Sequence, residues 1–176
     1  STLFPYTTLF RSVPPKVEPG ATLGQPPSDA TLMFNGRDLS GWESVNGGPA
    51  DWGVENGEMV IHPKSGSIQT RQKFGDCQLH VEWMVPVLPP DRKGQDRGNS
   101  GVYLQGLYEL QGLDSYDNPT YVNGEAGAIY KQSVPLVNAL KAAPNWQTYD
   151  IVYYAPRFYK DNTLAEPARI TVFLNG

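Results

Sequence analysis

The sequence predicts an all-β protein made of short antiparallel strands, and three observations lead to this fold class. The 176 residues include 18 glycines and 16 prolines, which favour turns, with 10 tyrosines, 6 phenylalanines and 4 tryptophans, which favour strands. Apolar and polar side chains alternate with a period of two in several segments. Roughly nine such segments lie between turn signals and none predicts a long helix, a pattern typical of an antiparallel sandwich or barrel.

The clearest strand spans residues 77–87, where Cys77, Leu79 and Val81 alternate with polar residues. Asn56–Gly57 lies between the segments 51–54 and 58–62, and this dipeptide is a strong signal for a β-hairpin. Further strands are predicted at 31–34, 67–70, 101–105, 107–113, 127–130, 149–155 and 169–174. The segment 136–142 is predicted to form one or two helical turns.

Both ends of the chain differ from the middle. Residues 1–12 have no initial Met and lack the pattern of a signal peptide, and they resemble translated adapter sequence, so we expect them to be non-native. Residues 13–30 contain five prolines and predict an arm or linker. The domain is therefore predicted to span 31–176. Because Asn175–Gly176 predicts a hairpin turn with no second strand, we expect this domain to be incomplete at its C-terminus.

The composition argues against several classes of function. A net charge of -4 disfavours nucleic acid or an anionic membrane as the main partner. No apolar stretch approaches the roughly 18 residues that would predict a membrane span. The single cysteine, Cys77, cannot form an internal disulfide, and two histidines limit any histidine-rich metal site.

The segment 108–115 carries the strongest candidates for catalysis. Side chains alternate along a strand, so Glu109 and Gln111 are predicted to share one face. Asp114 would lie on the other face of a regular strand, unless a bulge or a strand end at Gly112 returns it. Two neighbouring carboxylates can divide acid and base work, and the alternative is a solvated strand face that ends in a turn-forming Asp.

A second group of polar residues precedes this segment. Asn99, Tyr103 and Gln105 occupy alternate positions and are predicted to face one side, where amides and a phenol could bind a sugar. An ordinary polar sheet face is the alternative. The loop 86–98 is longer than most connections and is expected to border the site.

The remaining candidates are more isolated in the sequence. His80 and Glu82 lie two residues apart on the polar face of strand 77–87, where they could bind a ligand or form a surface pair. Lys131 follows Tyr130 and could neutralise an oxyanion, although a solvated lysine is the alternative. Trp146 lies in a predicted turn and could stack on a sugar.

Several motifs, taken in order, resemble the 3-keto-disaccharide hydrolase family. The segment 32–42, LMFNGRDLSGW, is similar to the family's opening LFNGKDLSGW. The similarity continues through WGV at 52–54, FGDCQL at 74–79, VEW at 81–83, NSGVYL at 99–104, YELQ at 108–111, LDS at 113–115, GAIY at 127–130 and WQTYDI at 146–151. It covers about residues 30–176. Their order and spacing identify the chain as a member of this family.

This resemblance implies a fold and a cellular location. The fold is a concanavalin A-like jelly-roll sandwich of two antiparallel sheets. The protein is expected to be secreted or periplasmic, in bacteria that degrade glycans.

The resemblance also implies an enzyme that cleaves 3-keto-glycosides by removing the C2 proton, eliminating the C1 substituent and adding water. Glu109 and Asp114 are then expected to act as acid and base. Gln111 is expected in the same catalytic group, where it would hold the sugar. The expected substrate-binding residues are Asn99, Tyr103, Gln105, Tyr130, Lys131, His80, Glu82 and Trp146. Lys131 or a divalent cation would stabilise the enolate, and no other cofactor is implied.

Two alternatives remain open at this point. The spacing of Glu109, Gln111 and Asp114 is similar to the E-x-D-x-x-E motif of laminarinase-type sandwiches, which are direct retaining glycosidases. A jelly roll can also bind an oligosaccharide without cleaving it, because the fold does not fix the function.

Overall fold

The computed structural model describes residues 13–22 and 24–176, which form two compact units, one extending to Lys73 and the other running from Phe74 to Gly176. The predicted non-native segment, 1–12, lies outside the described residues. Between 13 and 30 the described residues form turns and bends without a strand or helix. No helix in the described part of the chain has the length and apolar character needed to cross a membrane.

The first unit contains two pairs of short antiparallel strands. Strand β1 (Trp42–Ser44) pairs with β4 (Ile68–Thr70), and β2 (Gly53–Glu55) pairs with β3 (Glu58–Val60). The predicted Asn56–Gly57 hairpin between β2 and β3 is confirmed. Both turn residues have positive φ, 52° and 85°, as a type I′ turn requires.

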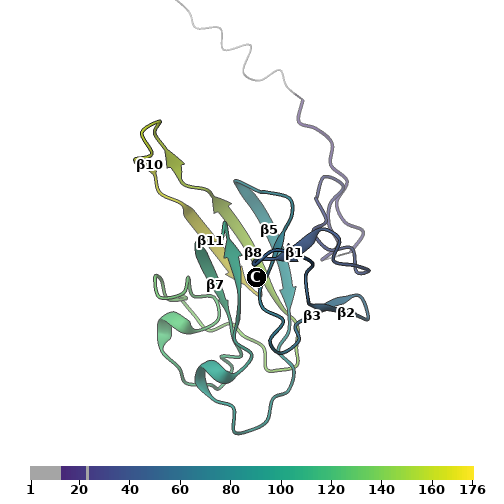
Figure 1. Cartoon of the computed structure of the whole chain (residues 1–176), viewed down its shortest axis with the longest axis vertical. Helices are drawn as coiled ribbons and strands as arrows, with labels where there is room; N and C mark the ends of the chain where they lie inside the picture. Colours follow the sequence, from purple (N-terminus) through teal and green to yellow (C-terminus); the bar gives the residue numbers. More distant parts are fainter. Residues whose placement is uncertain (1–12, 23) are drawn as a thin grey trace, which may run out of the picture. The chain divides into compact units, whose positions relative to one another are not determined.

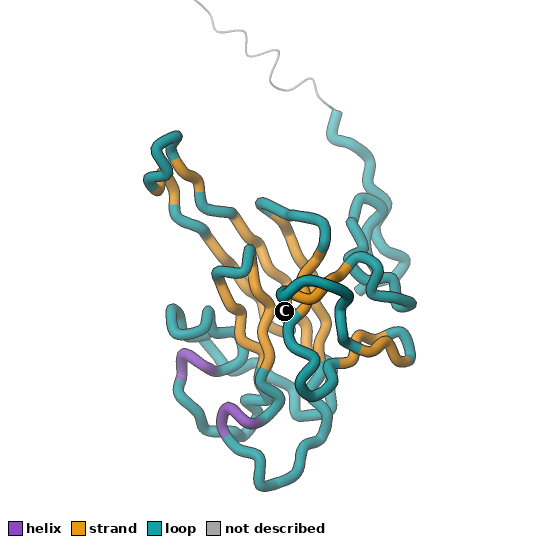
Figure 2. The backbone as a smooth tube through the Cα atoms, viewed as in Figure 1, coloured by secondary structure: helices purple, strands orange, loops and turns teal. Residues whose placement is uncertain are grey.

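The second unit contains seven strands and two short 3₁₀ helices (Figures 1 and 2). The strands are β5 (Cys77–Trp83), β6 (Ser100–Leu104), β7 (Tyr108–Gly112), β8 (Gln147–Tyr154), β9 (Arg157–Phe158), β10 (Leu164–Glu166) and β11 (Arg169–Leu174). The helices are η1 (Gly94–Asp96) and η2 (Val122–Gly124). All pairings are antiparallel: β11-β8-β5 form one sheet, β6 and β7 a second, and β9 and β10 a small hairpin.

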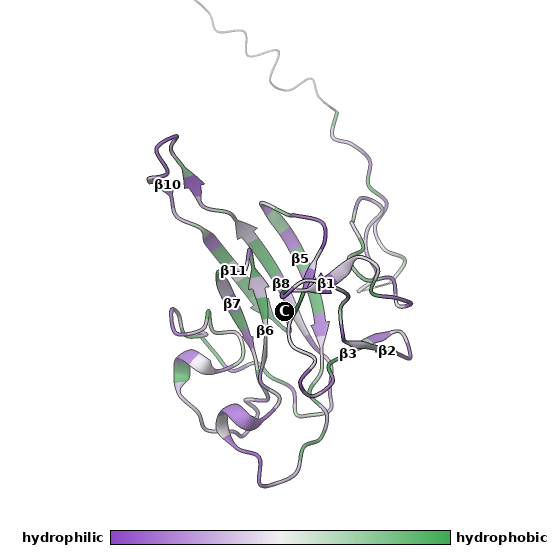
Figure 3. Ribbon diagram, in the orientation of Figure 1, coloured by the Kyte–Doolittle hydropathy of each residue, from purple (hydrophilic) through white to green (hydrophobic). Residues whose placement is uncertain are grey.

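The two larger sheets of this unit pack face to face around an apolar core. Tyr149, Ile151 and Tyr153 alternate along β8 and pack with Leu110 of β7, and all four side chains are at most 2% exposed. Figure 3 shows green apolar residues interspersed with purple and pale polar ones along β5, β8 and β11. Burying each such side chain contributes about 1.5–3 kcal/mol. The predicted all-β sandwich of antiparallel sheets is confirmed.

A hydrogen bond joins the two sheets through this core. The Tyr149 hydroxyl donates to the backbone carbonyl of Gln111 over 2.6 Å. Burial raises the pKa of Tyr149 well above its usual value, so the phenol stays a donor. The position of β7 is therefore fixed by a side chain from the opposite sheet.

Some predicted elements are wrong. Residues 31–34 form no strand, because the chain turns at Asn35, whose side chain accepts hydrogen bonds from the backbone N–H groups of Arg37 and Asp38. The segment 136–142 is not helical and leaves Leu136 almost fully exposed. Strand β5 ends at Trp83, four residues earlier than predicted, and the segment 127–130 contributes only two isolated bridges, both at Ile129.

Candidate active site

Glu109 lies on the outer face of the β6–β7 sheet, away from the core. Along β7, Leu110 points into the sandwich, so Glu109 and Gln111 share the opposite face as the alternation predicts. The strand register places Tyr103 of β6 directly opposite Glu109, and Gly101 opposite Gln111. The Glu109 side chain lies across Gly101, where a β-carbon would come within 2.5 Å of the Glu109 Oε1 atom.

The segment 127–130 runs along the other edge of β7. Ile129 forms a bridge with Leu110 and packs against the core, and the Tyr130 N–H donates to the Glu109 carbonyl over 2.8 Å. Tyr130 is therefore the cross-strand neighbour of Glu109 on the outer face. Glu109 thus lies between two phenols, Tyr103 on one side and Tyr130 on the other.

A third phenol, Tyr121, completes this group. Its hydroxyl lies 2.7 Å from the Tyr130 hydroxyl, and the two ring centroids are 6.2 Å apart. The hydrogen bond with Tyr130 is the main reason that the pKa of Tyr121 rises to about 12, and the charge of Glu109 adds to the effect. Partial burial, followed by the hydrogen bond and charge of Glu109, raises the pKa of Tyr103. At neutral pH Tyr103 and Tyr121 therefore remain proton donors.

A network of amides lies beside this carboxylate. Gln111 is 1% exposed, and its Nε2 donates to Asn99 Oδ1 over 3.2 Å and to Gln95 Oε1 over 3.3 Å. Gln95 also bonds to Thr120 and to the Gly124 carbonyl, so the predicted site loop 86–98 does border this face. Among the described residues, the Gln111 Oε1 atom has no donor. Buried acceptors are normally satisfied, and one bound water would supply the missing donor.

Asp114 is buried, 2% exposed, and holds an ion pair with Arg97 of the loop 86–98. Its Oδ2 atom accepts from both Nε and Nη2 of Arg97, and its Oδ1 atom accepts from the Tyr116 N–H over 3.2 Å. The strand ends at Gly112, which is one of the two arrangements expected, and Asp114 belongs to the following loop. Both carboxylate oxygens are engaged, so Asp114 fastens this loop to the end of β7.

One expected alignment does not hold, and one pair of candidates lies on the other sheet. Gln105 does not share the face of Tyr103: β6 ends at Leu104, Gln105 enters the hairpin turn with a φ of 53°, and its side chain accepts from the Tyr153 hydroxyl. His80 and Glu82 lie on the outer face of the β11-β8-β5 sheet, opposite the face that carries Glu109.

The other candidates occupy exposed positions. His80 Nδ1 lies 2.7 Å from Asp150 Oδ1, which makes His80 part of a surface pair. The Lys131 ammonium lies 5.2 Å from the centre of the Tyr130 ring, at the rim of the phenol group. Trp146 is 41% exposed in the turn that precedes β8.

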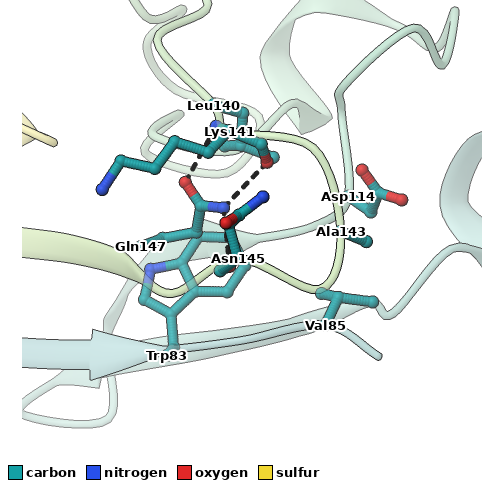
Figure 4. Close-up of a pocket in the computed structure, with 8 residues that line it drawn as sticks. All are labelled: Trp83, Val85, Asp114, Leu140, Lys141, Ala143, Asn145 and Gln147. Atoms are coloured by element: carbon teal, nitrogen blue, oxygen red, sulfur yellow. Dashed lines mark hydrogen bonds between the residues drawn. The ribbon is translucent and has the colours of Figure 1, made fainter. Parts of the chain in front are cut away.

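A separate small hollow lies where β5 ends and β8 begins (Figure 4). Gln147, on its floor, is buried and bonds to the N–H and carbonyl of Lys141 and to the Asn145 carbonyl. Asn175 also donates to the Gln147 Oε1 atom. Both ends of the Gln147 amide are engaged by groups of the chain, so this hydrogen-bond network stabilises the turn that precedes β8.

Within residues 13–22 and 24–176, no three His, Cys, Asp or Glu side chains gather as metal ligands. Residue spacing did not predict a role for Tyr121, Gln95 or Arg97. Gln95 belongs to the short helix η1, and the other two lie in loops. The length of the loop 86–98 was the one available signal for Gln95 and Arg97. Tyr121 had none, because the loop that carries it has no periodic pattern.

A β sandwich with a carboxylate among phenols and amides on one sheet face has the chemistry of a carbohydrate-active protein. The family model for the 3-keto-alpha-glucoside-1,2-lyase-like domain matches residues 29–176, and the chain belongs to this family. The resemblance seen in the sequence is thereby confirmed.

Solved structures from Parabacteroides distasonis ATCC 8503 are similar to this chain. One is a predicted glycosyl hydrolase with 49% sequence identity and a TM-score of 0.89, covering 97% of this chain and 73% of that chain. A second predicted glycosyl hydrolase has 24% identity and a TM-score of 0.60, covering 83% of this chain and 68% of that one, and shows the fold alone. No curated protein matches the chain.

Proposed function

We propose that this protein cleaves 3-keto-glycosides and that the outer face of β6–β7 is its active site. Family membership and the likeness to predicted glycosyl hydrolases support the substrate class. The observation that carries the proposal is the position of Glu109 between the phenols of Tyr103 and Tyr130. A carboxylate beside hydroxyl donors suits removal of a carbon-bound proton, because the donors stabilise the oxyanion that forms.

The reaction begins at C2 of the sugar. A ketone at C3 acidifies the C2 proton, which Glu109 removes, and the C–H electrons move into the carbonyl to give an enolate. The enolate expels the C1 substituent by β-elimination, and the departing oxygen takes the electrons of the C1–O bond and a proton. Water then adds across the C1–C2 double bond, with hydroxyl at C1 and hydrogen at C2. The net result is hydrolysis of the glycoside.

The neighbouring side chains have distinct roles in this proposal. Tyr103 is placed to donate a hydrogen bond to the enolate oxygen, and the exposed amide of Asn99, held by the buried amide of Gln111, to bind a sugar hydroxyl. Lys131, or a divalent cation in its place, would neutralise the enolate charge. Asp114 holds the loop 86–98 through Arg97, so we assign it a positioning role.

The same ion pair disfavours a direct retaining glycosidase. That mechanism needs two free carboxyl groups about 5–5.5 Å apart, one as nucleophile and one as acid. Asp114 is the carboxylate that follows Glu109 in the motif, and both of its oxygens are already engaged.

A non-catalytic sugar-binding module is the second candidate. The observation that favours it is the exposure of two aromatic side chains on this face: Tyr103 is 54% and Tyr121 42% exposed. Exposed aromatic rings beside hydrogen-bonding groups can bind a sugar without chemistry.

The test compares a glucoside with the matching 3-keto-glucoside, using purified wild-type protein and Glu109→Gln. Turnover of the keto form alone, abolished in Glu109→Gln, is the expected result. The control is Glu166→Gln, which removes an exposed carboxylate in the β9–β10 hairpin and should retain activity. Binding of both sugars without turnover of either would instead support the binding module.

The family resemblance also leads us to propose that the protein acts outside the cytoplasm, as a secreted or periplasmic protein. Fractionation of the native host, with detection of the protein by antibody, checks this. Recovery in the cytoplasmic fraction would overturn it.

A further inference from the structure

We propose that Tyr130 is the proton donor to the departing glycosidic oxygen, and that Tyr121 supports it by hydrogen bonding to its phenol oxygen. This inference rests on the proposed function, because it assigns the acid that the elimination step requires. It goes beyond the family resemblance and the sequence pattern, which pointed to Asp114 as the second acid–base group.

Tyr130 lies beside Glu109 on the outer face of the sheet. The backbone bond from the Tyr130 N–H to the Glu109 carbonyl, 2.8 Å, and the adjacent Ile129–Leu110 bridge make Tyr130 and Glu109 a cross-strand pair. Such pairs have β-carbons about 4.5–5.5 Å apart and point to the same face. A base at C2 and an acid at the oxygen on C1 must serve adjacent carbons of one sugar ring, which this spacing allows.

The phenols of Tyr130 and Tyr103 differ in the hydrogen-bond partner that would face a negative charge on the phenol oxygen. A phenol that gives up its proton needs a donor to the resulting phenolate. Tyr130 has such a partner in the Tyr121 hydroxyl, 2.7 Å away. With a pKa raised to about 12, Tyr121 keeps its proton and can direct it to Tyr130. The Tyr103 phenol, by contrast, bonds to the Glu109 carboxylate, which accepts a hydrogen bond and cannot donate one to a phenolate.

The proton balance of the cycle closes with these two residues. The C2 proton moves to Glu109, and the electrons of the C1–O bond leave with the glycosidic oxygen, which takes the proton of Tyr130. In the hydration step the Tyr130 phenolate accepts a proton from water as the hydroxyl bonds to C1. Glu109 returns its proton to C2. Both residues end in the state in which they began, and no oxidant or reductant is consumed.

The test uses two 3-keto-glucosides: the 4-nitrophenyl glycoside, which releases 4-nitrophenol, and the methyl glycoside, which releases methanol. A good leaving group departs without an acid, whereas an alkoxide needs one. For Tyr130→Phe we expect a loss of roughly 10²–10⁴-fold in kcat on the methyl substrate and little change on the nitrophenyl substrate. Tyr121→Phe should give a smaller loss with the same selectivity for the methyl substrate.

Exchange of the C2 hydrogen with D₂O, followed by NMR, measures proton removal by Glu109 independently of the departure of the C1 substituent. Tyr130→Phe should retain this exchange, and Glu109→Gln should lose it. The control is Tyr154→Phe, an exposed tyrosine on the outer face of the other sheet, which should match wild type in every assay.

Equal losses on both substrates in Tyr130→Phe, or no loss on either, would overturn the inference while leaving the proposed function intact. If Tyr130→Phe fails to fold, the substrate selectivity of Tyr121→Phe decides the question. Wild-type protein that turns over neither keto substrate would instead overturn the proposed function.

Discussion

The side chain of Glu109 occupies the space that a side chain at Gly101 would need. A β-carbon added to Gly101 would lie 2.7 Å from the Cγ atom of Glu109 and 3.1 Å from its Cδ atom. The glycine is required here by space, since its φ does not lie in the left-handed region. Gly101 therefore determines how the carboxylate lies on the sheet.

We expect Gly101→Ala to reduce turnover of a 3-keto-glucoside by about 10- to 100-fold, because displacing a reacting group by roughly 1 Å has a cost of this order. Glu109 is a flexible side chain that can move away, so the melting temperature should change little. Steady-state kinetics and thermal unfolding measure the two effects. Gly75→Ala is the matched control, because no atom lies within 4 Å of its added β-carbon. Unchanged activity in Gly101→Ala would contradict the assigned position of Glu109.

The ion pair between Arg97 and Asp114 leads to a prediction about stability. In Arg97→Met the buried Asp114 carboxylate loses its partner, so we expect a loss of about 3 kcal/mol in the free energy of unfolding. Urea denaturation measures it. Arg92→Met, at an exposed position of the same loop, should have little effect. Adding Asp114→Asn to Arg97→Met should recover part of the loss, because it removes the unpaired charge.

The positioning role of Asp114 is tested by its own substitution. Asp114→Asn keeps the shape of the side chain but loses the charge that holds Arg97, so we expect a lower melting temperature and a moderate loss of turnover. The loss should be the same for the methyl and nitrophenyl 3-keto-glucosides, since Asp114 is not the acid in this proposal. A loss confined to the methyl substrate would identify Asp114 as the acid.

The Tyr121–Tyr130 pair predicts a change of stability at alkaline pH. The pKa of Tyr121 is about 12 in the folded protein and about 10 in an unfolded chain. Between these values the folded state holds a proton that the unfolded state has lost, so stability decreases as pH rises from about 10 to 12. Tyr121→Phe should make this decrease shallower. Urea unfolding at several alkaline pH values measures the slope, and an unchanged slope would contradict the pair.

The sequence predicted the regular strands well where one face is buried. Alternation located β5, β8 and β11, because each places apolar side chains in the core at every second residue. The Asn56–Gly57 turn was also correct, since its geometry depends only on local φ preferences. The strand predicted at 31–34 was wrong because a short apolar run cannot reveal whether a partner strand exists.

In the candidate site, too, the positions of residues on regular strands were predicted and the contacts of loop residues were not. The shared face of Glu109 and Gln111 follows from strand period, and Tyr103 falls opposite Glu109 because both strands are regular. Gln105 was misplaced because the period-two rule was extended past Leu104 into a turn with positive φ. His80 and Glu82 lie on the polar face of β5 as predicted, but strand period does not say which of the two sheets a strand joins. The contacts of Arg97 and Tyr121 depend on loop paths, for which no periodic signal exists.

The hydrogen bond from Tyr149 to the Gln111 carbonyl has a consequence for how this protein can change over time. The length of the Tyr149 side chain sets the distance between the β11-β8-β5 sheet and β7, the strand that carries Glu109. A substitution at position 149 that remains compatible with folding would still shift that strand. Selection on catalytic activity therefore also acts on this buried position, and substitutions in the core are constrained by the active site as well as by stability.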